Sequence, residues 1–125
     1  MSKKIIVIDD SQTIRQQVSI VLAGAGYTII EAEDGIEGAA LIRGNADAAL
    51  AICDVNMPRL SGIDMLESLR KEDAPLELPV LMLTTEGRPD LIERARSLGA
   101  KGWIVKPFKP TMLLAAVKKL AGEPS

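Results

Sequence analysis

Short apolar runs alternate with longer amphipathic stretches along this chain. The run Lys4–Asp9 is β-branched and apolar on both faces, and Ala49–Asp54 is apolar until its last residue; such runs are typical of strands in a parallel sheet covered on both sides. The pattern predicts five strands, at Lys4–Asp9, Tyr27–Glu31, Ala49–Asp54, Pro79–Thr84 and Gly102–Val105.

The amphipathic stretches predict five helices, one after each strand. Ser11, Asp34 and Ser61 stand where the first three helices need N-caps, and Pro89 and Pro110 suit the first turn of the last two. The second helix is expected to be short, over Gly35–Arg43, and glycines at positions 24, 26, 99 and 122 are expected to end the other helices they follow. Apolar positions recur at three- and four-residue steps. They are Ile14, Val18, Val21, Leu22 and Ala25; Ile63, Leu66 and Leu69; Leu91, Ile92, Ala95 and Leu98; and Leu113, Val117 and Leu120.

Five strands that alternate with five helices predict an α/β fold. Alternation of this kind implies right-handed crossovers, hence a single doubly wound domain with a five-stranded parallel sheet flanked by five helices. The 125 residues suit one domain, so we expect residues 1–125 to form it with no effector domain attached.

Composition narrows the possible functions. The net charge of −2 provides no general attraction to nucleic acid or to anionic membranes, and no apolar run reaches the roughly 20 residues of a membrane span. The single cysteine, Cys53, lies in an apolar run, so we expect a buried, inert thiol and a reducing, cytoplasmic setting. Histidine is absent, which excludes histidine-based triads and histidine zinc ligands.

Polar residues end several of the predicted strands. Asp9 and Asp10 end the first, Asp54 the third, Thr84 the fourth and Lys106 the fifth, and the carboxyl ends of parallel strands meet at one edge of the sheet. Three clustered carboxylates repel one another unless a hard cation such as Mg²⁺ joins them, and a lysine and a hydroxyl beside them suit an incoming phosphate. The set therefore favours phosphoryl transfer, although each residue alone is typical of a cap, turn or loop.

The chain resembles the bacterial response-regulator receiver family from Lys4 to Leu120, and within that family the free-standing chemotaxis regulators. The resemblance implies a flavodoxin-like fold. It also implies that Asp54 accepts the phosphoryl group and that Lys106 pairs with a phosphoryl oxygen, with the Lys106–Pro107 bond cis. The stretches that carry it are VIDDS, CDVNMP, LPVLMLTTEG and GAKGWIVKPF, together with the residue set Asp9–Asp10, Asp54, Thr84 and Lys106–Pro107.

The same resemblance implies a metal site and a switch. Asp10 would be the main Mg²⁺ ligand, joined by Asp54, by the backbone carbonyl of Asn56 and, partly through water, by Asp9. Thr84 would be the hydroxyl that moves to bind the phosphoryl group.

For three further positions the resemblance implies a functional role, and an ordinary structural role is the alternative. Trp103 stands at the aromatic switch position, where tyrosine or phenylalanine is usual; alternatively it caps the sheet edge with its N–H in water. Asn56 and Glu86 stand where the family tunes phosphoryl lifetime, or they are ordinary surface residues.

By this resemblance the protein is a monomeric two-component response regulator rather than an enzyme. A sensor histidine kinase would donate the phosphoryl group, and the target would be a flagellar motor switch protein or, for a phosphorelay intermediate, a histidine phosphotransferase. A receiver-like docking module that takes no phosphate is another reading. A haloacid-dehalogenase-like phosphatase is disfavoured because Asp9 and Asp10 are adjacent, and a flavin module because the segment after the first strand is acidic.

Overall fold

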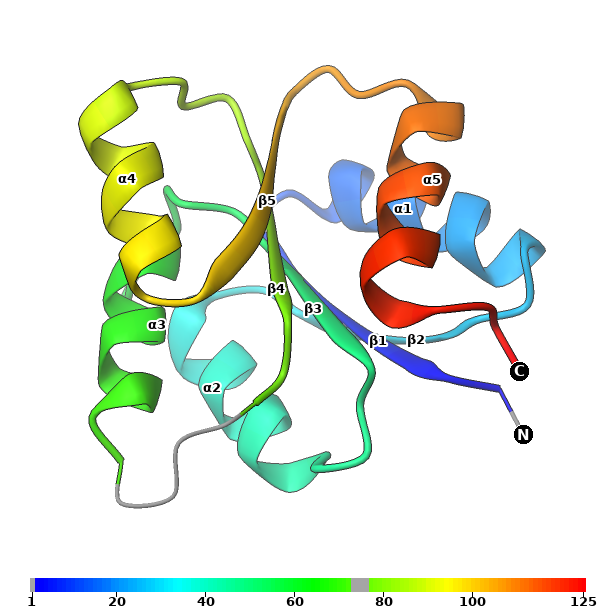
Figure 1. The fold of residues 1–125 in the computed structure, drawn as a ribbon, viewed down its shortest axis with the longest axis horizontal. Coiled ribbons are helices and arrows are strands. Elements are labelled where there is room, and N and C mark those ends of the chain that lie inside the picture. The colour runs from blue at the N-terminus through cyan, green and yellow to red at the C-terminus, as the bar shows by residue number, and fades with distance from the viewer. Residues whose placement is uncertain (1, 73–76) are drawn as a thin grey trace.

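The computed structural model describes residues 2–72 and 77–125, and it confirms the predicted doubly wound fold (Figure 1). Within the described residues, five strands and five helices alternate strictly along the chain. They are β1 (Lys4–Ile8), α1 (Gln12–Gly24), β2 (Thr28–Ala32), α2 (Gly35–Gly44), β3 (Leu50–Cys53), α3 (Gly62–Arg70), β4 (Val80–Thr84), α4 (Pro89–Ser97), β5 (Ala100–Val105) and α5 (Pro110–Ala121).

The five strands form one parallel sheet in the order β2-β1-β3-β4-β5. The order reverses direction between β1 and β3, which places the point where ligands bind in such sheets beyond the carboxyl ends of these two strands. Strands β1, β3 and β4 carry aliphatic side chains buried on both faces, as the apolar runs predicted.

Helices cover both faces of the sheet and create two cores (Figure 1). Helices α1 and α5 lie on one face, where Leu22 and Leu113 are fully buried against strand side chains. Helices α2, α3 and α4 lie on the other, where Ile42, Leu66 and Ala95 pack against the sheet. The apolar stripes read from the sequence therefore face the sheet.

Local signals placed the helix ends well. The side chains of Ser11, Asp34 and Ser61 each accept a hydrogen bond from the backbone N–H three residues on, as N-caps do. Pro89 and Pro110 open α4 and α5 as predicted. Among the described residues, none of the helices is both long enough and apolar enough to pass through a bilayer.

Strand ends were predicted less well. Three of the predicted strands begin one residue too early, and those read as ending at Asp9 and Asp54 end one residue before each aspartate. Asp9 leaves the strand because its carboxylate accepts the N–H of Ser11 in a tight turn. Strand β5 begins two residues earlier than predicted, because Ala100 pairs with Val80 across an irregularity in the register.

Candidate functional site

Three carboxylates meet at the carboxyl-terminal edge of the sheet. Asp9 and Asp10 follow β1, Asp54 follows β3, and one oxygen from each lies within 4.8 Å of the other two. Asp9 and Asp54 are buried, whereas Asp10 is exposed to solvent. The donors are all oxygen and one side is open to water, so the cluster fits Mg²⁺ better than zinc or copper.

Lys106 stands directly beside this cluster. Its Nζ donates to Asp9 Oδ2 at 2.7 Å and to Asp54 Oδ2 at 3.0 Å, and its side chain is only 10% exposed. Burial by itself lowers the pKa of Lys106, but the hydrogen bonds to Asp9 and Asp54 outweigh burial and leave this pKa raised. The ammonium is therefore charged. It lies beside the carboxylates, as the strand-end pattern predicted, and it bridges two of them, which the pattern did not predict.

Asp9 is held from several directions. Its Oδ1 accepts the N–H of Ser11 at 2.9 Å, and its backbone oxygen accepts from the Arg15 guanidinium at 2.6 Å. Burial raises the pKa of Asp9 despite the opposing effects of Lys106 and the Ser11 N–H. A buried carboxylate of this kind gains from any further cation placed against it.

Asp54 is oriented by the chain that follows it. Its Oδ1 accepts the N–H of Val55 at 2.7 Å and that of Asn56 at 3.4 Å, while Oδ2 faces Lys106. Behind it, a Cβ on Gly62 would lie 2.0 Å from the backbone oxygen of Asp54, so only glycine fits there. The carboxylate is thus fixed in direction before any ligand arrives.

Thr84 is completely buried at the end of β4. Its Oγ1 accepts the N–H of Glu86 at 3.2 Å, and its backbone oxygen accepts the N–H of Lys106 at 2.8 Å. The hydroxyl oxygen therefore already accepts a hydrogen bond from the loop between β4 and α4. The Lys106–Pro107 peptide bond is cis, as predicted.

Trp103, Asn56 and Glu86 form a connected set. The Trp103 indole N–H donates to the backbone oxygen of Glu86 at 2.9 Å, and the Asn56 side-chain amide donates to Glu86 Oε1 at 3.1 Å. The alternative that leaves the indole N–H in water is wrong for this structure, because the β4–α4 loop provides an acceptor. Three segments are joined here: β5, the β4–α4 loop and the β3–α3 loop.

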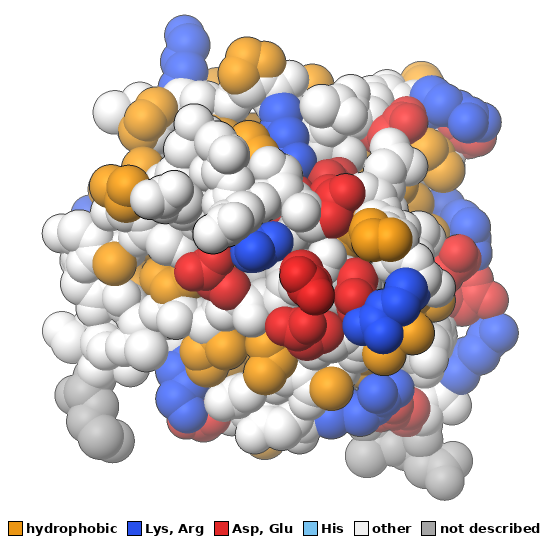
Figure 2. Space-filling model, turned by 180° about the vertical axis from the view of Figure 1, so that it is seen from behind, with side chains coloured by type: hydrophobic (Ala, Val, Ile, Leu, Met, Phe, Trp, Pro, Cys, Tyr) orange, Lys and Arg blue, Asp and Glu red, His pale blue; other side chains and the backbone are white. Residues whose placement is uncertain are grey.

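Sequence reasoning missed a second ionic contact close by. Figure 2 shows acidic side chains gathered near the centre of one face, with basic side chains beside them. Apart from the trio above, Glu33, Asp34 and Glu37 also bring carboxylate oxygens within 4.8 Å of one another. Asp34, read from the sequence as a helix cap, is also bound by Arg59 at 2.6 Å. No short-range signal connects residues 25 positions apart.

Cys53 lies at the end of β3, buried as predicted. Burial, followed by the charge of Asp54, raises the pKa of its thiol. A thiol with a raised pKa carries little thiolate, so its inertness follows.

Comparison with known proteins identifies the class. The sequence-family model of the response regulator receiver domain matches residues 5–118 of this chain. The chain belongs to the response regulator receiver family, as its motifs implied. It is 36% identical over 120 residues to the chemotaxis protein CheY1 of Helicobacter pylori, covering 95% of this chain and 97% of that protein. It is also 36% identical over 119 residues to the chemotaxis protein CheY of Pseudomonas aeruginosa, covering 94% of each.

Solved structures of chemotaxis regulators have the same fold as this chain. The chemotaxis protein CheY4 of Vibrio cholerae superposes with a TM-score of 0.87 at 38% identity, covering 96% of this chain and 99% of that one. CheY from a CheX–CheY–BeF3–Mg²⁺ complex of Borrelia burgdorferi superposes with a TM-score of 0.86 at 26% identity, covering 94% and 87%. The chain is therefore a CheY-like receiver domain.

Proposed function

We propose that this protein is a response regulator that accepts a phosphoryl group on Asp54 with the help of Mg²⁺ and changes its partner-binding surface in response. The observation that carries the proposal is the bridging of Asp9 and Asp54 by the Lys106 ammonium at the edge of a three-carboxylate cluster. One cation already sits against the acceptor, and the remaining carboxylate charge suits a second.

Asp10, Asp54 and the backbone carbonyl of Asn56 would hold the ion, with Asp9 assisting through water. When bound, Mg²⁺ neutralises negative charge on the carboxylates and on an incoming phosphoryl group. The residues of the chain have separate tasks. Lys106 holds a phosphoryl oxygen as a point charge, and the Val55 N–H keeps Asp54 turned toward the donor.

The phosphoryl group would come from phosphohistidine on a sensor histidine kinase. This chain contains no histidine, so a phosphohistidine donor must be a separate residue on a partner. An oxygen of Asp54 attacks phosphorus, the P–N bond to the donor imidazole breaks, and that nitrogen keeps the bonding electron pair and takes a proton. The product is an acyl phosphate on Asp54. The protein is changed by the reaction and awaits hydrolysis, so we class it as a switch rather than an enzyme.

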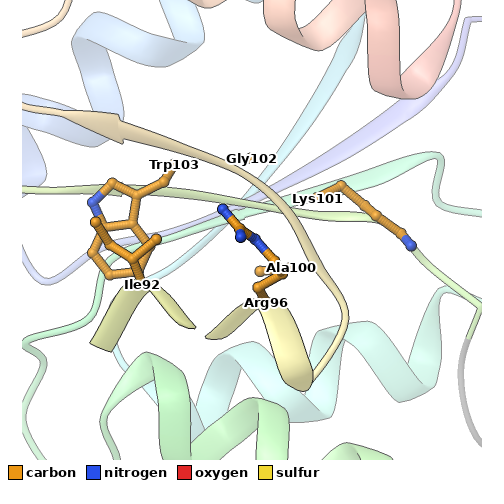
Figure 3. Close-up of a pocket in the computed structure, with 6 residues that line it drawn as sticks. All are labelled: Ile92, Arg96, Ala100, Lys101, Gly102 and Trp103. Carbon is orange, nitrogen blue, oxygen red and sulfur yellow. The ribbon is translucent and has the colours of Figure 1, made fainter. Parts of the chain in front are cut away.

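The switch would run through Thr84 and Trp103. The Thr84 hydroxyl would leave the Glu86 N–H to bind a phosphoryl oxygen, at a gain of about 1.5–3 kcal/mol for a hydrogen bond to a charged group. Because Trp103 is bound to Glu86, that shift would disturb the hollow between α4 and β5 (Figure 3), which is lined by Ile92, Arg96, Ala100, Lys101, Gly102 and Trp103. A partner that reads this surface would register the change.

The contacts of Asn56 and Glu86 support their role in phosphoryl lifetime, because their side chains bond each other beside the acceptor. Changing either side chain would alter access of water to the acyl phosphate. This role is independent of the partner that reads the switch.

Chemotaxis is the setting we propose, with a flagellar motor switch protein as target, in the cytoplasm and as a monomer. Support comes from relatives named chemotaxis proteins and from the Borrelia burgdorferi CheY whose structure holds CheX, BeF3 and Mg²⁺. The second candidate is a phosphorelay intermediate that passes the group to a histidine phosphotransferase. Transfer of the phosphoryl group from this protein to a histidine phosphotransferase domain would support the phosphorelay intermediate, and no transfer would support the chemotaxis regulator.

Intact-protein mass spectrometry after incubation with acetyl phosphate tests the proposal. We expect the wild type to gain one phosphoryl group with Mg²⁺ and none with EDTA, and Asp54→Asn to gain none in either. Asp47→Asn, an exposed aspartate paired with Lys4, serves as the matched control and should behave as wild type. Labelling of Asp54→Asn equal to wild type would refute the acceptor assignment.

A further inference from the structure

The loop between β3 and α3, residues 54–61, contains a strained turn. We call this segment the acceptor loop. The Leu60 N–H donates to the backbone oxygen of Pro58 at 2.7 Å, which closes a three-residue turn around Arg59. Arg59 has φ of 67°, and among the described residues it alone takes a positive φ without being glycine. Such turns are rare and persist where surrounding contacts hold them.

The contact that holds Arg59 is its ion pair with Asp34. Nε of the guanidinium donates to Asp34 Oδ2 at 2.8 Å, and a terminal nitrogen forms an ion pair with the same oxygen at 2.6 Å. The other oxygen, Oδ1, accepts the N–H of Glu37 at 2.9 Å and caps α2. The side chain of Asp34 is 5% exposed, and the Glu37 N–H together with Arg59 lowers the pKa of Asp34. The carboxylate is therefore ionised and anchored to a rigid helix.

Close packing leaves the acceptor loop little freedom. A Cβ on Gly35 would lie 2.3 Å from the backbone oxygen of Leu60, so the loop lies directly against the start of α2. At its other end the Gly62 N–H donates to the Val55 oxygen at 2.9 Å. Between these two fixed ends lies Asn56, whose carbonyl is the proposed backbone ligand for Mg²⁺.

We propose that Arg59 and Asp34 are positioning residues for the metal site: their ion pair fixes the acceptor loop so that the Asn56 carbonyl and the Asp54 carboxylate face one point. The inference rests on the proposed function, because it concerns the same Mg²⁺ site. It predicts that two side chains outside the three-carboxylate cluster control how tightly the chain binds Mg²⁺.

Simple electrostatics predicts a different result, which makes the inference testable. Removing the positive charge of Arg59 leaves the site more negative and should strengthen Mg²⁺ binding, whereas removing the negative charge of Asp34 should weaken it. Positioning predicts that both changes weaken binding. It also predicts that the double variant is no weaker than the weaker single variant, because both changes break one contact.

The experiment is a Mg²⁺ titration of the full chain without any phosphoryl donor, followed by amide ¹H–¹⁵N shifts and by calorimetry. The variants are Arg59→Gln, Asp34→Asn and the double variant, and Asn retains the ability to cap α2. Arg59→Gly is added because glycine accepts a positive φ, so this variant loses the ion pair without backbone strain. Arg43→Gln, which breaks the exposed ion pair of Arg43 with Glu72, is the matched control.

We expect each variant of the pair to weaken Mg²⁺ binding about tenfold, as loss of groups that orient metal ligands commonly does, and the control to bind as wild type. The amides of Val55 and Asn56 should shift in the metal-free variants. Wild-type affinity in folded Arg59→Gly, or tighter binding by Arg59→Gln, would overturn the positioning role and leave the proposed function intact. A wild type that binds no Mg²⁺ would overturn the metal site itself, and the inference with it.

Discussion

Replacing Lys106 with methionine removes the cation that bridges two buried carboxylates in the metal-free protein. The change keeps most of the side-chain volume and deletes the charge. We expect Lys106→Met to lower the free energy of unfolding at neutral pH in EDTA, because Asp9 and Asp54 then face each other without compensation.

The magnitude follows from the geometry. Nζ lies 2.7 Å from the Asp9 oxygen and 3.0 Å from the Asp54 oxygen, so these oxygens are at most about 6 Å apart. Two unit charges at about 6 Å repel by about 3 kcal/mol at an effective dielectric constant of about 20. Proton uptake by Asp9 limits the penalty, because burial already raises its pKa. We therefore expect a loss of about 2–4 kcal/mol at pH 7.

The pH dependence has a definite sign. A carboxyl whose pKa is raised on folding stabilises the protein when protonated, and this contribution is lost as pH rises through the folded pKa. Removing Lys106 raises the pKa of Asp9 further, so the destabilisation should grow with pH above the ordinary value of 3.8 and shrink in acid. Added Mg²⁺ should narrow the difference, because the ion replaces the lost cation.

Urea unfolding followed by circular dichroism measures these quantities, in EDTA and in Mg²⁺ across a pH series. Lys119→Met, on an exposed lysine of α5, controls for general loss of positive charge. An unfolding free energy for Lys106→Met equal to or above that of wild type in EDTA at pH 7 would refute the reasoning. So would a loss that is independent of pH.

Three further changes have expected outcomes. Gly62→Ala should cost about 3 kcal/mol in urea unfolding, because its Cβ would lie 2.0 Å from a backbone oxygen of the acceptor loop, whereas Gly44→Ala, with open space around the Cβ, should not destabilise. Trp103→Phe should cost about 1 kcal/mol beyond lost packing, because the Glu86 carbonyl loses its donor; an unchanged amide spectrum of the β4–α4 loop would argue against that contact. The pKa of Asp34 is lowered on folding, so its contribution to stability is present above pH 3.8 and is lost as pH falls further. The stability difference between wild type and Asp34→Asn should therefore shrink in acid, and a constant difference down to pH 2 would contradict this.

Much of the fold could be predicted because its signals are local. The caps at Ser11, Asp34 and Ser61 act over three residues, so they are legible without tertiary information. The start of β5 could not be read, because Ala100 joins the sheet only through its pairing with Val80. Neither residue carries a signal for that register.

The candidate site divides in the same way. Parallel strands place their carboxyl ends at one edge, so the meeting of Asp9, Asp54 and Lys106 followed from the order of elements alone. The hydrogen bonds that each side-chain oxygen of the site makes could not be predicted from the order of elements. That Lys106 takes one oxygen from each aspartate, and that the Thr84 hydroxyl binds the Glu86 N–H, depends on how the loops close over the sheet.

The sequence by itself determined the elements, the fold class and the set of side chains at the functional edge, because periodicity and capping act over a few residues. The tertiary structure decided the contacts that connect this edge to its surroundings. Arg59 reaches Asp34 across 25 positions and Trp103 reaches Glu86 across 17, and such pairs form only when separate helices and strands pack side by side. Their geometry is a product of packing, which no short stretch of sequence encodes.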